Sequence, residues 1–126
     1  MTTVLDASAL LAFLQGEPGA DVVETAMENA AACDAANWSE IARRIHAADR
    51  DRHLVKALLM SYDLRVEPVT SADAELAARR WRRGEGRSLA DRLCLALGER
   101  LDAQILTDDT HWGTSESHPP DRLTDS

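Results

Sequence analysis

The sequence lacks any long apolar segment: no run of about 18 hydrophobic residues occurs, which excludes a membrane-spanning helix. Its first residues carry no basic segment and already include Asp6, so they do not resemble a secretory signal. Cysteine is nearly absent, and Cys33 and Cys94 stand too far apart for a disulfide framework or a Cys-x-x-Cys zinc site. The few histidines are scattered, so a zinc centre is not expected. We therefore expect a reduced, cytoplasmic protein with no membrane association.

Aromatic and basic residues are also scarce. Aromatics make up 4% of the chain, and 14 Lys and Arg residues face 22 Asp and Glu residues, for a net charge of -8. This balance excludes a uniformly cationic nucleic-acid-binding protein, but it permits a local basic strip or a site that uses the acids themselves. The apolar content of 44% over 126 residues predicts one domain, 1–126, with a small alanine-rich core. Residues 113–126, rich in Ser, Pro and Asp, are expected to form a surface tail.

Short β-type segments alternate with helical ones along the chain. The predicted strands are 2–6, 32–36, 65–69, 103–107 and a short one at 122–124. The predicted helices are 8–14, 20–31, 37–48, 50–62, 71–83 and 88–101. This alternation predicts an α/β fold with a short parallel sheet covered by helices. In such folds the working site lies beyond the carboxyl ends of the strands.

Acidic residues occur at the predicted carboxyl edge of the sheet: acids stand at the ends of two predicted strands and in the first turns of two predicted helices. These acids are Asp6, Glu40, Asp91, Asp108 and Asp109. Clustered carboxylates raise one another's pKa and cost stability, and a divalent cation removes that cost. Oxygen ligands with no Cys or His among them suit Mg²⁺ or Mn²⁺ rather than zinc.

Helix capping is the competing interpretation of these acids. Ser88 and Asp91 have the spacing of a capping box, and so do Asn37 and Glu40. Asp6 could cap the following helix, and the Asp pair at 108–109 could form a turn. Asp91 shares its helix face with apolar residues, which favours an inward direction. Glu40 could equally form an i,i+4 ion pair with Arg44.

Four blocks of the chain, taken in order, resemble a known family. They are Val4-Leu-Asp-Ala-Ser-Ala-Leu-Leu, Asn37-Trp-Ser-Glu-Ile, Ser88-Leu-Ala-Asp and Ile105-Leu-Thr-Asp-Asp followed by Trp112. The chain resembles a PIN domain, specifically the toxin subunit of VapBC-type toxin–antitoxin pairs. The resemblance implies a three-layer α/β/α fold. It also implies a metal-dependent endoribonuclease that inhibits translation, forms a homodimer and is neutralised by a cognate antitoxin.

The resemblance also assigns roles to residues of this chain. Its acidic quartet matches Asp6, Glu40, Asp91 and Asp109, all expected to be catalytic. Of these, Asp6, Asp91 and Asp109 are expected to hold Mg²⁺, with Mn²⁺ as an alternative, and Glu40 a water or a second ion. Ser8 and Thr107 match small hydroxyl residues beside the acids. Asp108 is an extra acid, so the fourth ligand is Asp109 or its neighbour.

RNA must then be held by a protein of net negative charge. The densest basic run is Arg79-Arg-Trp-Arg-Arg, followed by Arg87. Arginines around an aromatic suit phosphate contact and base stacking, although cations near a helix C-terminus are also favoured by the helix dipole. The predicted RNA-binding residues are Arg43, Arg44, Arg82, Arg83 and Arg87.

Other folds also place carboxylates at a sheet edge. A receiver domain has its acidic pair after the first strand and a late lysine, but Lys56 is the only lysine here. A phosphatase with an aspartyl nucleophile has Asp-x-Asp after its first strand, where this chain has Ser8. The remaining alternative is a non-catalytic interaction module of the same fold.

Overall fold

The structure, a computed structural model, describes residues 2–108 and 121–122. Its strands are β1 (Thr3–Leu5), β2 (Ala31–Asp34), β3 (Arg65–Glu67), β4 (Gln104–Thr107) and β5 (Asp121–Arg122). Its helices are α1 (Ala7–Leu14), α2 (Ala20–Asn29), α3 (Ala35–Ala47), α4 (Arg52–Ser61), α5 (Ser71–Arg79) and α6 (Leu89–Arg100). None of these helices has the length and apolarity needed to span a bilayer.

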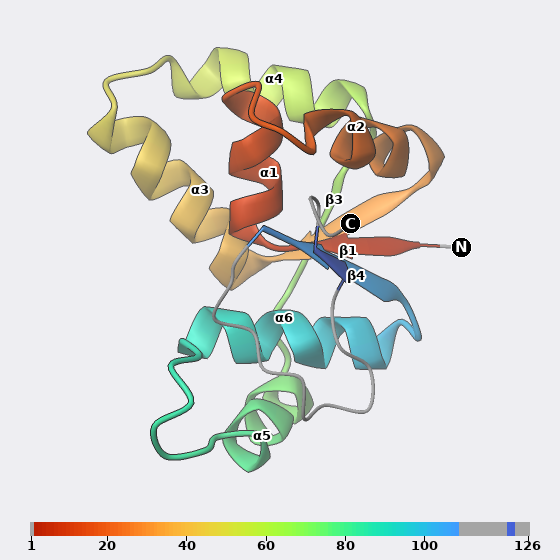
Figure 1. Ribbon diagram of the computed structural model, residues 1–126, viewed down its shortest axis with the longest axis vertical. Coiled ribbons are helices and arrows are strands. Elements are labelled where there is room, and N and C mark those ends of the chain that lie inside the picture. Colours follow the sequence, from red (N-terminus) through yellow and green to blue (C-terminus); the bar gives the residue numbers. More distant parts are fainter. Residues whose placement is uncertain (1, 109–120, 123–126) are drawn as a thin grey trace.

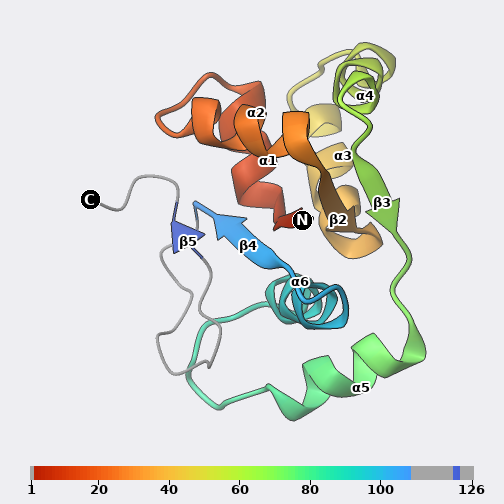
Figure 2. The ribbon, with the colours of Figure 1, turned by 90° about the vertical axis from the view of Figure 1, so that its right-hand side faces the viewer.

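The strands form one parallel sheet in the order β3-β2-β1-β4-β5. Figure 1 shows α1 to α4 on one side of the sheet and α5 and α6 on the other. Figure 2 shows β3 and β5 at opposite edges of the sheet, with α5 outside α6. The predicted three-layer α/β/α fold is therefore confirmed. Because all strands run in one direction, their carboxyl ends meet at the same edge.

The core consists of two apolar clusters separated by the sheet. Successive residues of a strand point to opposite faces, and β1 shows this directly. Leu5 packs with Leu10 and Ile41 under α1 to α4, whereas Val4 packs with Leu97 of α6. All five side chains are buried. Their burial fixes the register of β1 and so determines which face each following residue meets.

Several predicted boundaries were wrong, and capping explains the main one. Helix α3 begins at Ala35 rather than at 37, because the Asp34 side chain caps it by accepting from the Asn37 backbone N–H at 2.8 Å. The proposed capping box between Asn37 and Glu40 is therefore wrong, and β2 ends at Asp34. Helix α5 ends at Arg79 instead of 83. In the predicted tail, β5 pairs with β4.

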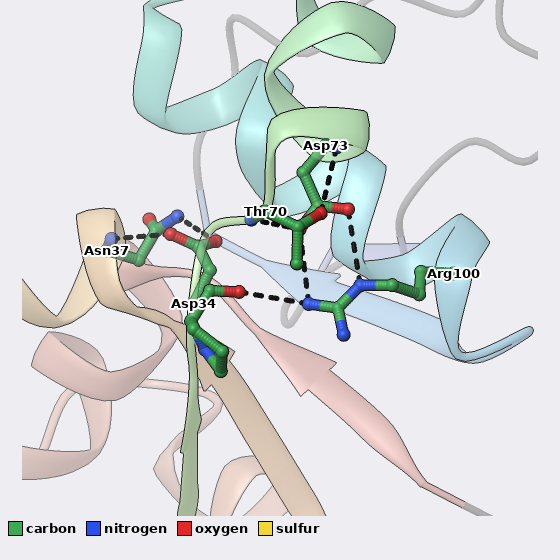
Figure 3. A network of polar contacts seen from close by, with 6 residues as sticks. Asp34, Asn37, Thr70, Asp73 and Arg100 are labelled. Atoms are coloured by element: carbon green, nitrogen blue, oxygen red, sulfur yellow. Dashed lines mark hydrogen bonds and ion pairs between the residues drawn. The ribbon is translucent and has the colours of Figure 1, made fainter.

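A capping box formed by Thr70 and Asp73 anchors α5 against α6. Thr70 and Asp73 exchange hydrogen bonds of 3.0 and 3.1 Å at the start of α5. Figure 3 shows the guanidinium of Arg100, at the end of α6, reaching this cap. Arg100 donates to both carboxylate oxygens of Asp73, at 3.2 and 3.1 Å, and to the Pro68 carbonyl at 3.0 Å. This contact holds α5 as the outer cover of α6.

Gly98 permits α6 to lie close to the sheet. A Cβ at this position would lie 2.5 Å from Cδ1 and 2.7 Å from Cγ1 of Ile105 in β4. Such distances are well inside van der Waals contact, so no larger residue fits without movement. The glycine therefore determines how near the helix that carries Asp91 comes to the strands.

We expect Gly98→Ala to lower the free energy of unfolding by up to about 2 kcal/mol. Overpacking costs about 1–3 kcal/mol, and alanine returns about 1 kcal/mol of helix propensity. Urea denaturation measures the effect. In an Ile105→Val background the same substitution should cost less, because the crowding methyl group is gone. An equal cost in both backgrounds would contradict this explanation.

Candidate active site

A cleft of about 670 Å³ lies at the carboxyl edge of the sheet. Its walls come from the start of α1, one face of α3 and the start of α6. Four of the predicted acids line it, together with two serines and one arginine: Asp6, Glu40, Asp91, Asp108, Ser8, Ser88 and Arg44. Residues separated by most of the chain are thus gathered at the edge where α/β folds place their sites.

Asp6 occupies the centre of this arrangement, between the end of β1 and the start of α1. It caps α1, since its Oδ1 accepts from the Ala9 backbone N–H at 2.9 Å. The same oxygen accepts from the Ser8 hydroxyl at 2.8 Å, and Oδ2 accepts from the Thr107 hydroxyl. The residue is only 2% exposed. Capping and a place in the cleft therefore coexist at Asp6.

Ser8 connects the ends of β1 and β4. Besides donating to Asp6, its hydroxyl oxygen accepts from the Asp108 backbone N–H at 2.8 Å and lies 3.1 Å from the Thr107 hydroxyl. The two hydroxyl residues predicted beside the acids are therefore in contact with Asp6 and with each other. They hold one carboxylate in a single orientation.

The environment of Asp6 disfavours its negative charge. Burial raises the pKa of Asp6 to about 6, although the hydrogen bonds from Thr107, Ala9 and Ser8 favour the ionised form. The nearby charge of Asp91 raises this pKa further. A bound cation would offset both penalties, because it favours the ionised carboxylates.

Asp91 comes from the first turn of α6 and completes the predicted capping box. Its backbone N–H donates to Ser88 Oγ at 3.1 Å, and its Oδ2 accepts from the Ser88 N–H at 2.9 Å. The side chain is half-buried and lines the cleft with Asp6. The two interpretations of Asp91, as a cap and as a site residue, therefore do not exclude each other.

Glu40 lies on the α3 wall of the cleft and carries an ion pair. Its Oε2 accepts from Arg43 at 2.8 Å, so the expected partner Arg44 is replaced by the residue one position earlier. The hydrogen bond from Arg43 lowers the pKa of Glu40. At 44% side-chain exposure this pair is a surface contact, and it constrains Glu40 only weakly.

Asp109 and Trp112 lie outside the described residues. Asp108 is described: its backbone N–H is held by Ser8, and the residue lines the cleft. The choice between these two neighbouring acids stays a prediction.

The described acids fit a magnesium ion in number and chemistry. Within residues 2–108 no group of three Asp, Glu, His or Cys side chains could hold a metal by itself. Magnesium, however, is commonly bound through one or two carboxylates and keeps several of its waters. Asp6 and Asp91 supply two oxygen donors at one cleft, and the fully buried cysteines Cys33 and Cys94 do not line it. This donor set suits a hard cation and does not suit zinc.

The predicted basic residues take different positions. Arg44 is exposed and lines the cleft, whereas Arg43 is paired with Glu40. Arg82 and Arg83 are exposed on the segment between α5 and α6. Arg87 differs from the other predicted RNA-binding residues in being buried. Its side chain is 1% exposed and forms an ion pair with Glu85 at 3.3 Å.

Two residues, one at the carboxyl end of β2 and one in the first turn of α3, were not recognised as part of this region. Asp34 and Asn37 are each 2% exposed, and Asn37 lines the cleft. Burial raises the pKa of Asp34, against the hydrogen bonds donated by Asn37. The signal was present in the sequence, because Asp34 follows the apolar segment Ala-Ala-Cys and precedes a helical stretch, as an N-cap does.

The family model of the PIN domain matches residues 3–113. The chain belongs to the PIN-domain family. This PIN domain is 33% identical over 114 residues to ribonuclease VapC42 of Mycobacterium tuberculosis, with 82% of this chain and 87% of the relative covered. A VapC ribonuclease of Mycobacterium bovis matches it to the same extent.

Solved structures with low sequence identity share the fold of this PIN domain. A toxin–antitoxin complex from Klebsiella pneumoniae matches with a TM-score of 0.66 at 18% identity, covering 86% of this chain and 87% of the other. The Sarcin-Ricin loop cleaving toxin VapC20 of Mycobacterium tuberculosis matches with a TM-score of 0.65 at 18% identity, covering 84% and 87%. These matches agree with the α/β/α layers described above.

The raised pKa of Asp6 predicts how the free energy of unfolding changes with pH when a chelator keeps the protein free of metal ions. Between pH 3.8 and about 6 the folded protein binds more protons at Asp6 than the unfolded chain does. The contribution of Asp6 is therefore most favourable at low pH and declines as the pH rises through this window. We therefore expect the wild type to lose about 3 kcal/mol of unfolding free energy relative to Asp6→Asn as the pH rises through this window.

Asn fits this position, because its side-chain oxygen can accept from Ala9 and Ser8 while the Thr107 hydroxyl accepts from its amide. Urea denaturation at several pH values measures the difference. A difference that does not change with pH would show that Asp6 is not destabilised by burial.

Proposed function

We propose that this PIN domain is an endoribonuclease that depends on Mg²⁺, with Mn²⁺ as an alternative, and hydrolyses phosphodiester bonds of RNA. The observation that carries the proposal is the convergence of Asp6 and Asp91 at one cleft. Their parent elements, β1 and α6, are far apart in the chain, and Asp91 contributes to the raised pKa of Asp6. The identity to VapC ribonucleases supports the same activity.

In this proposal Asp6, Asp91 and Asp109 hold the cation. When bound, Mg²⁺ neutralises charge on the phosphate and lowers the pKa of a water that can attack phosphorus. The hydroxyls of Ser8 and Thr107 keep the Asp6 carboxylate in a fixed orientation, so little reorganisation is needed. Glu40, on the α3 wall of the cleft, can accept a hydrogen bond from a water at the reacting phosphate.

In this proposal the RNA phosphates contact Arg44 at the cleft. This guanidinium is exposed and lies on the same wall as Glu40. Arg82 and Arg83 provide further exposed positive charge on the segment that leads to α6. Phosphate contacts of this kind position a nucleic acid without reading its sequence.

The biological role we propose is that of the toxin in a type II toxin–antitoxin pair, acting in the cytoplasm by inhibiting translation. Its partners are a cognate antitoxin and a second copy of this chain. The fold is shared with a toxin–antitoxin complex. An apolar groove between α3 and α4, lined by Trp38, Ile45 and Val55, offers a surface for such a protein partner.

We expect Asp91→Asn to abolish RNA cleavage, lowering the rate at least about a hundredfold, while the protein stays folded. The substitution removes the negative charge, but its side-chain oxygen still accepts from the Ser88 N–H, so the capping box survives in part. Cleavage of a labelled RNA with Mg²⁺ and thermal unfolding measure the two effects.

Asp73→Asn is the matched control, because Asp73 occupies the same place in the capping box of α5 and lies outside the cleft. It should lower stability and leave cleavage intact. Near wild-type cleavage by Asp91→Asn would return Asp91 to a purely capping role. A wild-type protein that neither binds Mn²⁺ nor cuts RNA would favour the non-catalytic interaction module.

A further prediction concerns Arg44 and RNA affinity. Arg44→Gln should weaken binding of a single-stranded RNA and reduce the slope of log affinity against log salt by about one, because one phosphate contact is lost. Fluorescence anisotropy in the Asp91→Asn background measures binding without cleavage. Arg65→Gln, at the amino edge of the sheet, should change neither quantity. An unchanged slope for Arg44→Gln would exclude Arg44 from the RNA-binding surface.

A further inference from the structure

A buried asparagine lies where three walls of the cleft meet. The Oδ1 of Asn37 accepts from the Ala7 backbone N–H at 3.0 Å. Its Nδ2 donates to Asp34 Oδ2 at 2.8 Å and to the Ala90 carbonyl at 3.0 Å. Asn37 is 2% exposed, so one carboxamide links the starts of α1, α3 and α6 out of contact with bulk water. Figure 3 shows the Asp34 part of this contact.

The chemistry of its partners fixes the orientation of this amide. The Ala90 carbonyl and an ionised Asp34 carboxylate can only accept hydrogen bonds, and the Ala7 N–H can only donate one. A flipped amide would therefore place like groups together at every contact. Asp34 also accepts from the Asn37 backbone N–H at 2.8 Å, which holds the residue itself in place. Hydrogen bonds thus hold both the backbone N–H and the side-chain carboxamide of Asn37.

Two of the three side-chain contacts lie next to acids of the cleft. Ala7 directly follows Asp6, and Ala90 directly precedes Asp91. Glu40 stands three residues after Asn37 on α3, less than one helical turn away. The Ala7 N–H also belongs to the first turn of α1, where backbone donors have no partner within the helix. The Asn37 side chain accepts the hydrogen bond of the Ala7 N–H and also donates to the Ala90 carbonyl, so it connects the backbone beside Asp6 to the backbone beside Asp91.

We propose that Asn37 is a positioning residue that sets the separation of Asp6 and Asp91, and thereby the affinity of the cleft for a divalent cation. The inference rests on the proposed nuclease function and extends it to a residue that contributes no acid. Asn37 acts through the backbones of Ala7 and Ala90 and does not touch the cation. Outer contacts that orient metal ligands typically change metal affinity or activity by about 10- to 100-fold.

The test uses two variants of the full chain. Asn37→Ala removes all three side-chain contacts. The exchanged pair Asp34→Asn with Asn37→Asp keeps one carboxylate and one carboxamide between these positions, and residue 34 can still cap α3. It selectively removes the donor to Ala90, so the link between α3 and α6 is broken while the link to Ala7 can persist. Asn29→Ala is the control, because the exposed Asn29 lies outside the cleft and donates to the Thr25 carbonyl at 2.7 Å within its own helix.

Mn²⁺ binding by calorimetry, RNA cleavage against Mg²⁺ concentration and thermal unfolding are measured for each protein. We expect both variants to bind Mn²⁺ about tenfold more weakly and to need correspondingly more Mg²⁺ for half-maximal rate, with the KM for RNA unchanged. Asn29→Ala should match the wild type in all three measurements.

Wild-type Mn²⁺ affinity and Mg²⁺ dependence in the exchanged pair and in folded Asn37→Ala would overturn the inference. A fall in rate that only follows the fraction of unfolded protein, with an unchanged Mg²⁺ midpoint, would overturn it equally. Failure of the proposed function is seen separately, because the wild-type protein would then neither bind Mn²⁺ nor cut RNA.

Discussion

The site depends on a carboxylate, Asp6, that is buried at the end of a central strand. Taking such a charge out of water is costly, and the surrounding donors repay only part of that cost, so the pKa stays raised. The Ser8 and Thr107 hydroxyls and the Ala9 backbone N–H hold the carboxylate without neutralising it. A carboxylate that is buried, rigidly held and only partly stabilised by its donors is well prepared to receive a cation.

Helix starts explain how the neighbouring groups come to the same place. Parallel strands end at one edge, and the helices that follow β1 and β2 begin there, capped by Asp6 and Asp34. Helix α6 begins at the same cleft, capped by Ser88 with Asp91. Each helix start offers unpaired N–H groups and the positive end of a helix dipole, which favour negative side chains. Three of these capping residues, Asp6, Ser88 and Asp91, therefore also line the cleft.

Much of this was visible in the sequence. The alternation of short β-type and helical segments predicted a parallel sheet covered by helices, and the resemblance to PIN domains predicted its three layers. The spacing of Ser88 and Asp91 predicted the start of α6 correctly. Asp6 was predicted both as a cap and as a site residue, and its contacts show a cap that lines the cleft. The predictions failed where a polar residue had a partner distant in sequence. Asn37 was assigned to a capping box with Glu40, yet its side chain contacts residues near positions 7 and 90.

Local patterns along the chain determined the elements, their order and most of the acids at the sheet edge, because periodicity and capping act over a few residues. Tertiary structure alone decided which of these groups meet. It buried the side chain of Arg87 and placed Arg44 in the cleft. It also brought one carboxamide between three helix starts. Such contacts depend on how far α3 and α6 approach β1, and that distance is set by packing across the sheet, including Gly98 against Ile105.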